Sequence, residues 1–183
     1  MKADKIILGI DPGTTIMGYG LINIRNNHPE LLTLGHIELH KLKDHYEKLK
    51  RIFDRTILLI GEFKPDELAI ESPFYGNNVQ SMLKLGRAQG AAISAALFKN
   101  LPIYEYAPRK IKQSITGQGS ASKEQVARLL QKILLIEQLP DNLDATDGVA
   151  VAMCHFYQSS TIKIKGEFKN WKDFVQKNPD RIK

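Results

Sequence analysis

The first forty residues alternate short apolar runs with polar breaks. Apolar runs occupy residues 5–10, 18–24 and 31–38, and they are separated by Asp-Pro-Gly and by the polar segment 25–30. Runs of this length that are bounded by turn-forming residues are typical of strands. The pattern therefore predicts a meander of three antiparallel strands.

The remainder of the chain alternates between helical and strand-like patterns. Apolar residues recur close to the helical period, and short apolar runs lie between the helical segments. We expect helices at residues 43–63, 77–99, 110–115 and 122–135 and from residue 143 onward, with strands at 67–70 and 101–106. This order predicts an α/β fold, in which a mixed five-stranded sheet carries helices on its faces.

Length and charge suggest one domain and a basic tail. A chain of 183 residues with 43% hydrophobic content is long enough for one well-buried core and short for two. We expect a single domain over residues 1–158 and a tail over residues 159–183, which carries +4 of the net charge of +6. The body is therefore not broadly basic, and a polyanion would be bound by local patches or by the tail. The tail could equally be a solubilising extension.

Membrane insertion, disulfides and thiolate zinc sites are not expected. The longest apolar runs are far shorter than the ~20 residues that a bilayer span needs, and the N-terminus lacks the pattern of a signal peptide, so we expect a cytoplasmic protein. Cys154 is the only cysteine and should be a buried core thiol. His155 should close the last helix, where a cation is favourable.

Four carboxylates stand at positions where strands end or a helix begins. Asp11 follows the first apolar strand directly, and Glu71 follows the strand at 67–70. If these strands are neighbours, both acids lie side by side at one edge of the sheet. Asp144 and Asp147 stand one turn apart at the head of the last helix. Acids there often cap the helix, so capping and chemistry both remain open for this pair.

A cluster of all four acids would require cations. Each pair of like charges at ~4 Å repels by about 4 kcal/mol at an effective dielectric constant of 20. Oxygen ligands without histidine or cysteine favour Mg²⁺ or Mn²⁺. Two such ions ~3.5–4 Å apart are suited to the in-line attack of water on a phosphodiester. The sequence thus suggests metal-dependent phosphodiester cleavage.

Five sequence blocks resemble one family of nucleases. They read GIDPGTTIMGYGLI (9–22), AIESPFYGNN (69–78), LKLGRAQG (83–90), EYAPRKIKQSITGQGSASKEQV (105–126) and DATDGVAVAMCH (144–155). In this order they closely resemble the RuvC family of Holliday-junction resolvases. The resemblance implies a ribonuclease-H-like fold with helices on both faces of the sheet, a homodimer, and cooperation with the RuvA–RuvB branch-migration complex. It also implies nicking of two symmetric strands of a four-way DNA junction in recombination and repair, which leaves 5'-phosphate and 3'-hydroxyl ends.

The resemblance assigns roles to individual residues. It implies a catalytic site with two Mg²⁺ ions, for which Mn²⁺ can substitute, bound by the four acids Asp11, Glu71, Asp144 and Asp147.

Three further residues fall on the family's DNA contacts. Lys112 and Lys123 match basic positions near the scissile phosphate, and Phe74 matches an aromatic residue that stacks on an unpaired base. From the residues alone, both lysines could hold phosphate or lie on a solvated helix face. Phe74 could equally be tucked under its own turn.

Three other functions compete with this interpretation. GIDPGTT also resembles the phosphate loop of actin-like ATPases and sugar kinases, but the chain is too short to supply their second domain. The chain could be another ribonuclease-H-like nuclease that acts on RNA or on other DNA structures. It could also bind junctions without cutting them, although the presence of all four acids argues against that reading.

Overall fold

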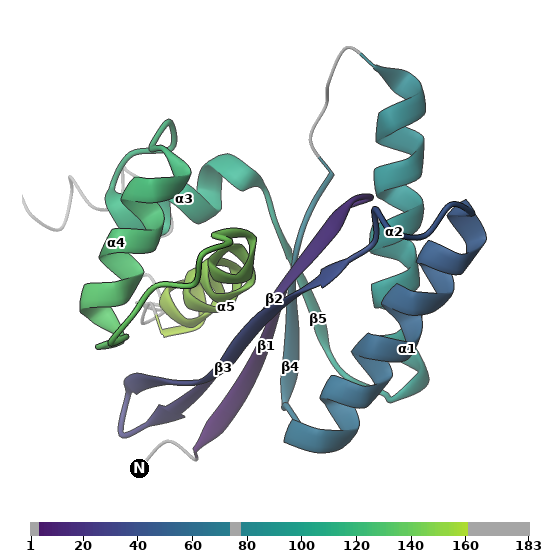
Figure 1. The fold of residues 1–183 in the computed structure, drawn as a ribbon. Coiled ribbons are helices and arrows are strands. Elements are labelled where there is room, and N and C mark those ends of the chain that lie inside the picture. Colours follow the sequence, from purple (N-terminus) through teal and green to yellow (C-terminus); the bar gives the residue numbers. More distant parts are fainter. Residues whose placement is uncertain (1–3, 74–77, 161–183) are drawn as a thin grey trace, which may run out of the picture.

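The protein folds around one mixed five-stranded sheet. The computed structural model describes residues 4–73 and 78–160 (Figure 1). The strands are β1 (Lys5–Asp11), β2 (Ile16–Arg25), β3 (His28–Glu38), β4 (Glu67–Glu71) and β5 (Ile103–Tyr106). They lie in the order β3-β2-β1-β4-β5. The first three pair antiparallel, whereas β4 runs parallel to β1 and β5 runs parallel to β4, which confirms the predicted mixed sheet.

Helices cover both faces of the sheet, as expected. One face carries α1 (His45–Phe63) and α2 (Val79–Phe98), and the other carries α3 (Pro108–Thr116), α4 (Lys123–Ile133) and α5 (Asp144–Ser160) (Figure 1). Each layer has its own buried core. Leu8 and Ile10 of β1 pack toward α1 and α2, and Ile7 packs toward the other three helices. The central strand is therefore buried on both sides, as is usual for strands with parallel partners.

Glycines allow α5 to lie unusually close to β1 and β2. A methyl group at Gly18 would stand 2.1 Å from the backbone oxygen of Asp144, and one at Gly9 would stand 2.1 Å from that of Gly148. A methyl group at Gly148 itself would meet the backbone of Tyr19 at 2.4 Å. Any side chain at these positions would push the helix away. This glycine seam (Gly9, Gly18, Gly148) therefore fixes where the first turn of α5 stands.

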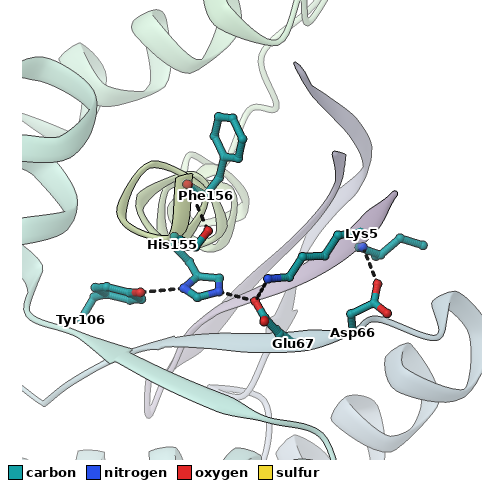
Figure 2. A network of polar contacts seen from close by, with 8 residues as sticks. Lys5, Asp66, Glu67, Tyr106, His155 and Phe156 are labelled. Carbon is teal, nitrogen blue, oxygen red and sulfur yellow. Dashed lines mark hydrogen bonds and ion pairs between the residues drawn. The ribbon is translucent and has the colours of Figure 1, made fainter. Parts of the chain in front are cut away.

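A buried polar network holds α5 to the sheet two turns farther along (Figure 2). The Nε2 atom of His155 lies 2.5 Å from the carboxylate of Glu67, and its Nδ1 atom lies 2.6 Å from the hydroxyl of Tyr106. Lys5 forms an ion pair with the same Glu67. Because the carboxylate can only accept, Nε2 carries the proton and Tyr106 donates to Nδ1. The network joins α5 to β1, β4 and β5.

This arrangement corrects the expectation for His155. The helix continues to Ser160, so His155 does not close it. Burial lowers the pKa of His155, even though Glu67 opposes that shift. The residue is thus a neutral hydrogen-bonding group rather than a cation at a helix end. Cys154 is buried, as predicted.

The predicted tail lies mostly outside the described residues. Residues 159 and 160 belong to α5, and residues 161–183 are not described. The division into a domain and a basic tail therefore stays a prediction. Across residues 4–73 and 78–160, no helix has the length and apolar character that crossing a membrane would require.

Candidate active site

Asp11 and Glu71 stand side by side at one edge of the sheet. In the parallel pair of β1 and β4, Ile10 lies opposite Ile70, and each acid is the next residue along its strand. Both strands run in the same direction, so their carboxyl ends meet at the same edge. The adjacency expected from the sequence is therefore present.

The first turn of α5 brings two more carboxylates to this edge. Gly18 is the β-sheet partner of Asp11, and the glycine seam places the backbone of Asp144 directly over it. Asp147 lines the same cavity as Asp11 and Glu71. The side chain of Asn142 accepts a hydrogen bond from the N–H of Asp144 at 2.9 Å. Asn142 thus takes up a backbone donor at the start of the helix, and the acidic side chains are directed elsewhere.

Lys123 is the direct partner of both helix acids. Its ammonium group forms ion pairs with Asp144 and, at 2.7 Å, with Asp147. Lys123 is the first residue of α4, and a capping box between Ser122 and Gln125 fixes that helix end. Burial opposes the charge on Lys123, but its hydrogen bonds to the two aspartates outweigh burial and raise its pKa.

Three of the acids and both lysines share one cavity of about 150 Å³. Its wall combines charged groups with apolar side chains from α3, α4 and α5. The lining residues are Asp11, Glu71, Pro108, Ile111, Lys112, Lys123, Val126, Asp147 and Ala150. The structure therefore brings together five of the seven site residues predicted from sequence and links a sixth, Asp144, through Lys123. The seventh, Phe74, lies outside the described residues.

Burial and mutual repulsion raise the pKa values of the clustered carboxyl groups. Burial, followed by the charge of Asp147, raises the pKa of Asp11 to about 7. Burial, followed by the charges of Asp11 and Asp147, raises the pKa of Glu71 to about 8. The pKa of Asp147 is also raised, mainly by burial. A site that resists negative charge in this way is stabilised by added cations.

The residues suit a divalent cation in their chemistry. The donors are all carboxylate oxygens, which hard cations prefer. Within the described part of the chain, no three acidic, histidine or cysteine side chains already stand close enough to share an ion. If these acids share an ion, their side chains would have to draw together, and Asp144 and Asp147 would have to exchange their contact with Lys123 for the metal.

Gln89 is a contact of the site that the sequence reasoning missed. This buried side chain of α2 donates to the backbone oxygen of Glu71 at 3.3 Å and to the carboxylate of Glu105 at 3.1 Å. It connects the end of β4 to the opposite helix layer. The signal in the sequence was a glutamine among the small residues of α2, which could have indicated a buried hydrogen-bonding side chain.

Comparisons with known proteins agree with this geometry. A family model for crossover junction endodeoxyribonuclease RuvC matches residues 7–155. The crossover junction endodeoxyribonuclease RuvC of Christiangramia forsetii is 58% identical over 183 residues, covering 100% of this chain and 95% of the relative. That of Porphyromonas gingivalis is 57% identical over 185 residues, covering 98% of each protein.

A solved structure agrees as well. RuvC of Thermus thermophilus in complex with a Holliday junction substrate superposes with a TM-score of 0.78 at 29% sequence identity, covering 85% of this chain and 94% of that one. The matches extend over the strands and helices that carry the acidic cavity. The chain belongs to the RuvC family of crossover junction endodeoxyribonucleases.

Proposed function

We propose that this chain cuts two symmetric strands of a Holliday junction by metal-dependent hydrolysis. The convergence of Asp11, Glu71 and Asp147 in one cavity with two lysines, in a member of this family, carries the proposal. The family implies a divalent metal, and we infer that it is Mg²⁺, with Mn²⁺ as a substitute. The proposed ligands are the four acids Asp11, Glu71, Asp144 and Asp147.

The acids would bind and orient two ions at the edge of the sheet. When bound, such a pair of ions activates the attacking water and neutralises charge at the leaving oxygen. Asp11 and Glu71 are held rigidly by their strands, and Asp147 is held by the glycine seam. The backbone positions of these acids are thus preorganised, and only their side chains would have to move to bind the ions. Hydrolysis would leave 5'-phosphate and 3'-hydroxyl ends.

The lysines would hold the DNA strand that is cut. Lys112 lies on α3 and Lys123 on α4, and both line the cavity that also contains the acids. If the aspartates bound metal instead of Lys123, its ammonium group would become available to a phosphate. A lysine in this role positions the backbone without reading sequence. Phe74 would stack on an unpaired base beside the site.

Symmetric cutting requires two copies of the site, and α2 offers the surface for a homodimer. Val79, Leu83 and Leu97 are all more than half exposed on this helix. Gly86 and Gly90 lie between them at helical spacing, and a methyl group at either glycine would meet nothing within 4 Å. An apolar stripe with small residues at its centre allows a second helix to approach closely. We place the dimer contact on this stripe.

Two further parts of the proposal concern the cell. We expect the dimer to act on junctions that the RuvA–RuvB complex moves. We also expect it to act in the cytoplasm, where bacterial DNA lies.

The decisive experiment combines a labelled synthetic four-way junction with the protein, with and without Mg²⁺. We expect paired symmetric nicks whose ends can be religated, and no comparable cleavage of linear duplex or RNA–DNA hybrid. Cleavage of the hybrid in preference to the junction would favour another ribonuclease-H-like nuclease. Junction binding without nicking in Mg²⁺ or Mn²⁺ would contradict the proposal.

A further inference from the structure

A second hollow lies on the other side of the sheet, between the edge strand β3 and helix α1. It has a volume of about 490 Å³. The side chains of Lys41, Arg51 and Arg55 line it together with Glu38 and the exposed Leu58. We call this hollow the β3–α1 groove. Neither the acidic cavity nor the proposed dimer stripe includes it.

The groove carries an excess of positive charge. Three of its lining residues are cations, and its one carboxylate, Glu38, is already paired with Lys41. Among residues 4–73 and 78–160, no acidic side chain forms an ion pair with Arg51 or Arg55. Two guanidinium groups therefore face the groove without a carboxylate partner in this part of the chain.

Arg55 is held in a fixed position. It donates a hydrogen bond to the hydroxyl of Tyr19 at 2.7 Å, and its guanidinium carbon lies 5.1 Å from the centre of that ring. Gly35 leaves the space for the Tyr19 hydroxyl, because a methyl group there would stand 2.5 Å from it. A guanidinium group has five N–H donors, so this contact uses only some of them. The remaining donors are preorganised for a ligand with several acceptor oxygens.

The groove begins close to the catalytic edge of the sheet. Asp11 pairs with Gly18 of β2, and Gly18 pairs with His36 of β3, which lines the groove. Neighbouring strands lie about 4.8 Å apart, so His36 stands about 10 Å from Asp11 across the sheet. Duplex DNA advances about 3.4 Å per base pair. The backbone of β3 at the groove therefore lies about three base-pair rises from that of Asp11.

We propose that the β3–α1 groove binds the phosphate backbone of the junction arm beside the cut, with Arg51 and Arg55 as its phosphate ligands. This inference rests on the proposed function and adds a DNA contact that lies outside the acidic cavity. Charge complementarity and the distance from Asp11 both favour DNA. The competing occupant is an acidic peptide that adds a strand to the open edge of β3. A peptide site would have no need to lie near Asp11, whereas a DNA site would.

Salt-dependent binding tests the groove directly. Anisotropy of a labelled junction is measured from 50 to 200 mM salt in metal-free buffer for the wild type, Arg51→Gln and Lys50→Gln. Lys50 is the matched control, because it lies on the same helix beside Arg51 but pairs with Asp54 outside the groove. We expect Arg51→Gln to reduce the slope of log K against log salt by about 1 and the affinity by about tenfold. Lys50→Gln should match the wild type.

Neutral phosphates locate the contact on the DNA. Methylphosphonates are placed singly at each of the first six positions on either side of the cut. We expect the wild type to lose affinity at about the third position, and Arg51→Gln to lose no more there than elsewhere. Thermal unfolding checks that Arg51→Gln and Lys50→Gln are folded.

The possible failures are distinguishable. If the wild type nicks the junction but Arg51→Gln and Lys50→Gln show the same slope, the groove does not bind DNA and the proposed function stands. If an acidic peptide binds the wild type but not Arg51→Gln while the slopes agree, the groove is a peptide site and the DNA proposal is wrong. If the wild type does not nick the junction in Mg²⁺, the proposed function is wrong, whatever the binding slopes show for the groove.

Discussion

Helices α5 and α2 both carry glycines on one face, but the surroundings of these glycines are opposite. Gly148 on α5 is closed against β2, where a methyl group would meet the Tyr19 backbone at 2.4 Å. Gly86 and Gly90 on α2 are open, with nothing within 4 Å of a methyl group. The closed glycine fixes two carboxylates within the chain. The open ones leave room for a second molecule. The neighbourhood of a glycine, not its presence, thus indicates its role.

The largest effect on junction cleavage should follow removal of a carboxylate on α5, the helix that the glycine seam holds against the sheet. Asp147→Asn should reduce junction cleavage by at least about 100-fold, which is the upper range for losing a group that only supports a metal ligand. Folding stability and junction binding should stay near wild type, because the substitution relieves repulsion from Asp11 and Glu71. Cleavage rates, thermal unfolding and anisotropy measure the three properties.

Asp141→Asn is the matched control for this substitution. Asp141 is exposed and precedes the same helix, so its removal should leave cleavage unchanged. Loss of stability in Asp147→Asn with cleavage retained would show that Asp147 only caps the helix.

The next largest effect should come from filling the closed seam. Gly18→Ala places a methyl group 2.1 Å from the backbone oxygen of Asp144. Overpacking of this kind costs about 1–3 kcal/mol, and it should displace Asp144 and Asp147 and slow cleavage. Chemical denaturation measures the free energy of unfolding, and junction nicking measures the site. An alanine variant as stable and active as the wild type would show that α5 does not depend on the seam.

A smaller effect should appear in the pH dependence of metal-free stability. The pKa of Asp11 rises from 3.8 in the unfolded chain to about 7 in the folded protein. Between these values the folded state retains a proton that the unfolded state releases, so this group lowers stability progressively from about pH 4 to pH 7. Asp11→Asn should reduce the slope but not abolish it, because burial also raises the pKa values of Glu71 and Asp147, and Mg²⁺ should stabilise the wild type more at pH 8 than at pH 5.

Denaturant titrations from pH 4 to pH 8 in EDTA measure this dependence. Asp141→Asn serves again as the control, because an exposed carboxylate should leave the slope as it is in the wild type. If stability changed with pH equally in the wild type and in Asp11→Asn, the pKa of Asp11 would not be raised by burial and by the charge of Asp147.

The smallest effect on folding should come from the open glycines. Gly86→Ala meets no atom, and alanine in a helix interior is favoured over glycine by about 0.5–1 kcal/mol. The protomer should become slightly more stable while the dimer weakens, which sedimentation equilibrium and thermal unfolding can separate. A less stable protomer would show that Gly86 packs within its own chain and is not open.

The sequence predicts the fold more completely than it predicts the contacts of the site. Strand and helix order followed from apolar periodicity, and the positions of Asp11 and Glu71 followed from where two buried runs end. The pairing of Lys123 with Asp144 and Asp147 did not follow, because it depends on how α4 packs on α5. The glycine seam was also missed, since a close helix approach leaves no periodic signal in the sequence.

His155 shows why the remaining contacts resist prediction. Its partners, Glu67 and Tyr106, lie 88 and 49 residues away along the chain. Only the sheet order brings β4 and β5 beneath α5. The same holds for Arg51 and Arg55, whose relation to Asp11 depends on strand register. Local patterns identify elements, whereas tertiary pairing decides which polar residues meet.

The order of the acids along the chain has a consequence for biosynthesis. Asp11 and Glu71 are made early, but Asp144 and Asp147 stand at the start of α5, the last of the described helices. A nascent chain can form its first strand pairs before that helix leaves the ribosome, because translation adds only about 5–20 residues per second. Until α5 docks, the growing polypeptide has only two of the four acids of the proposed site, and the cavity lacks the wall that α5 supplies. The proposed catalytic site is therefore incomplete until the end of synthesis.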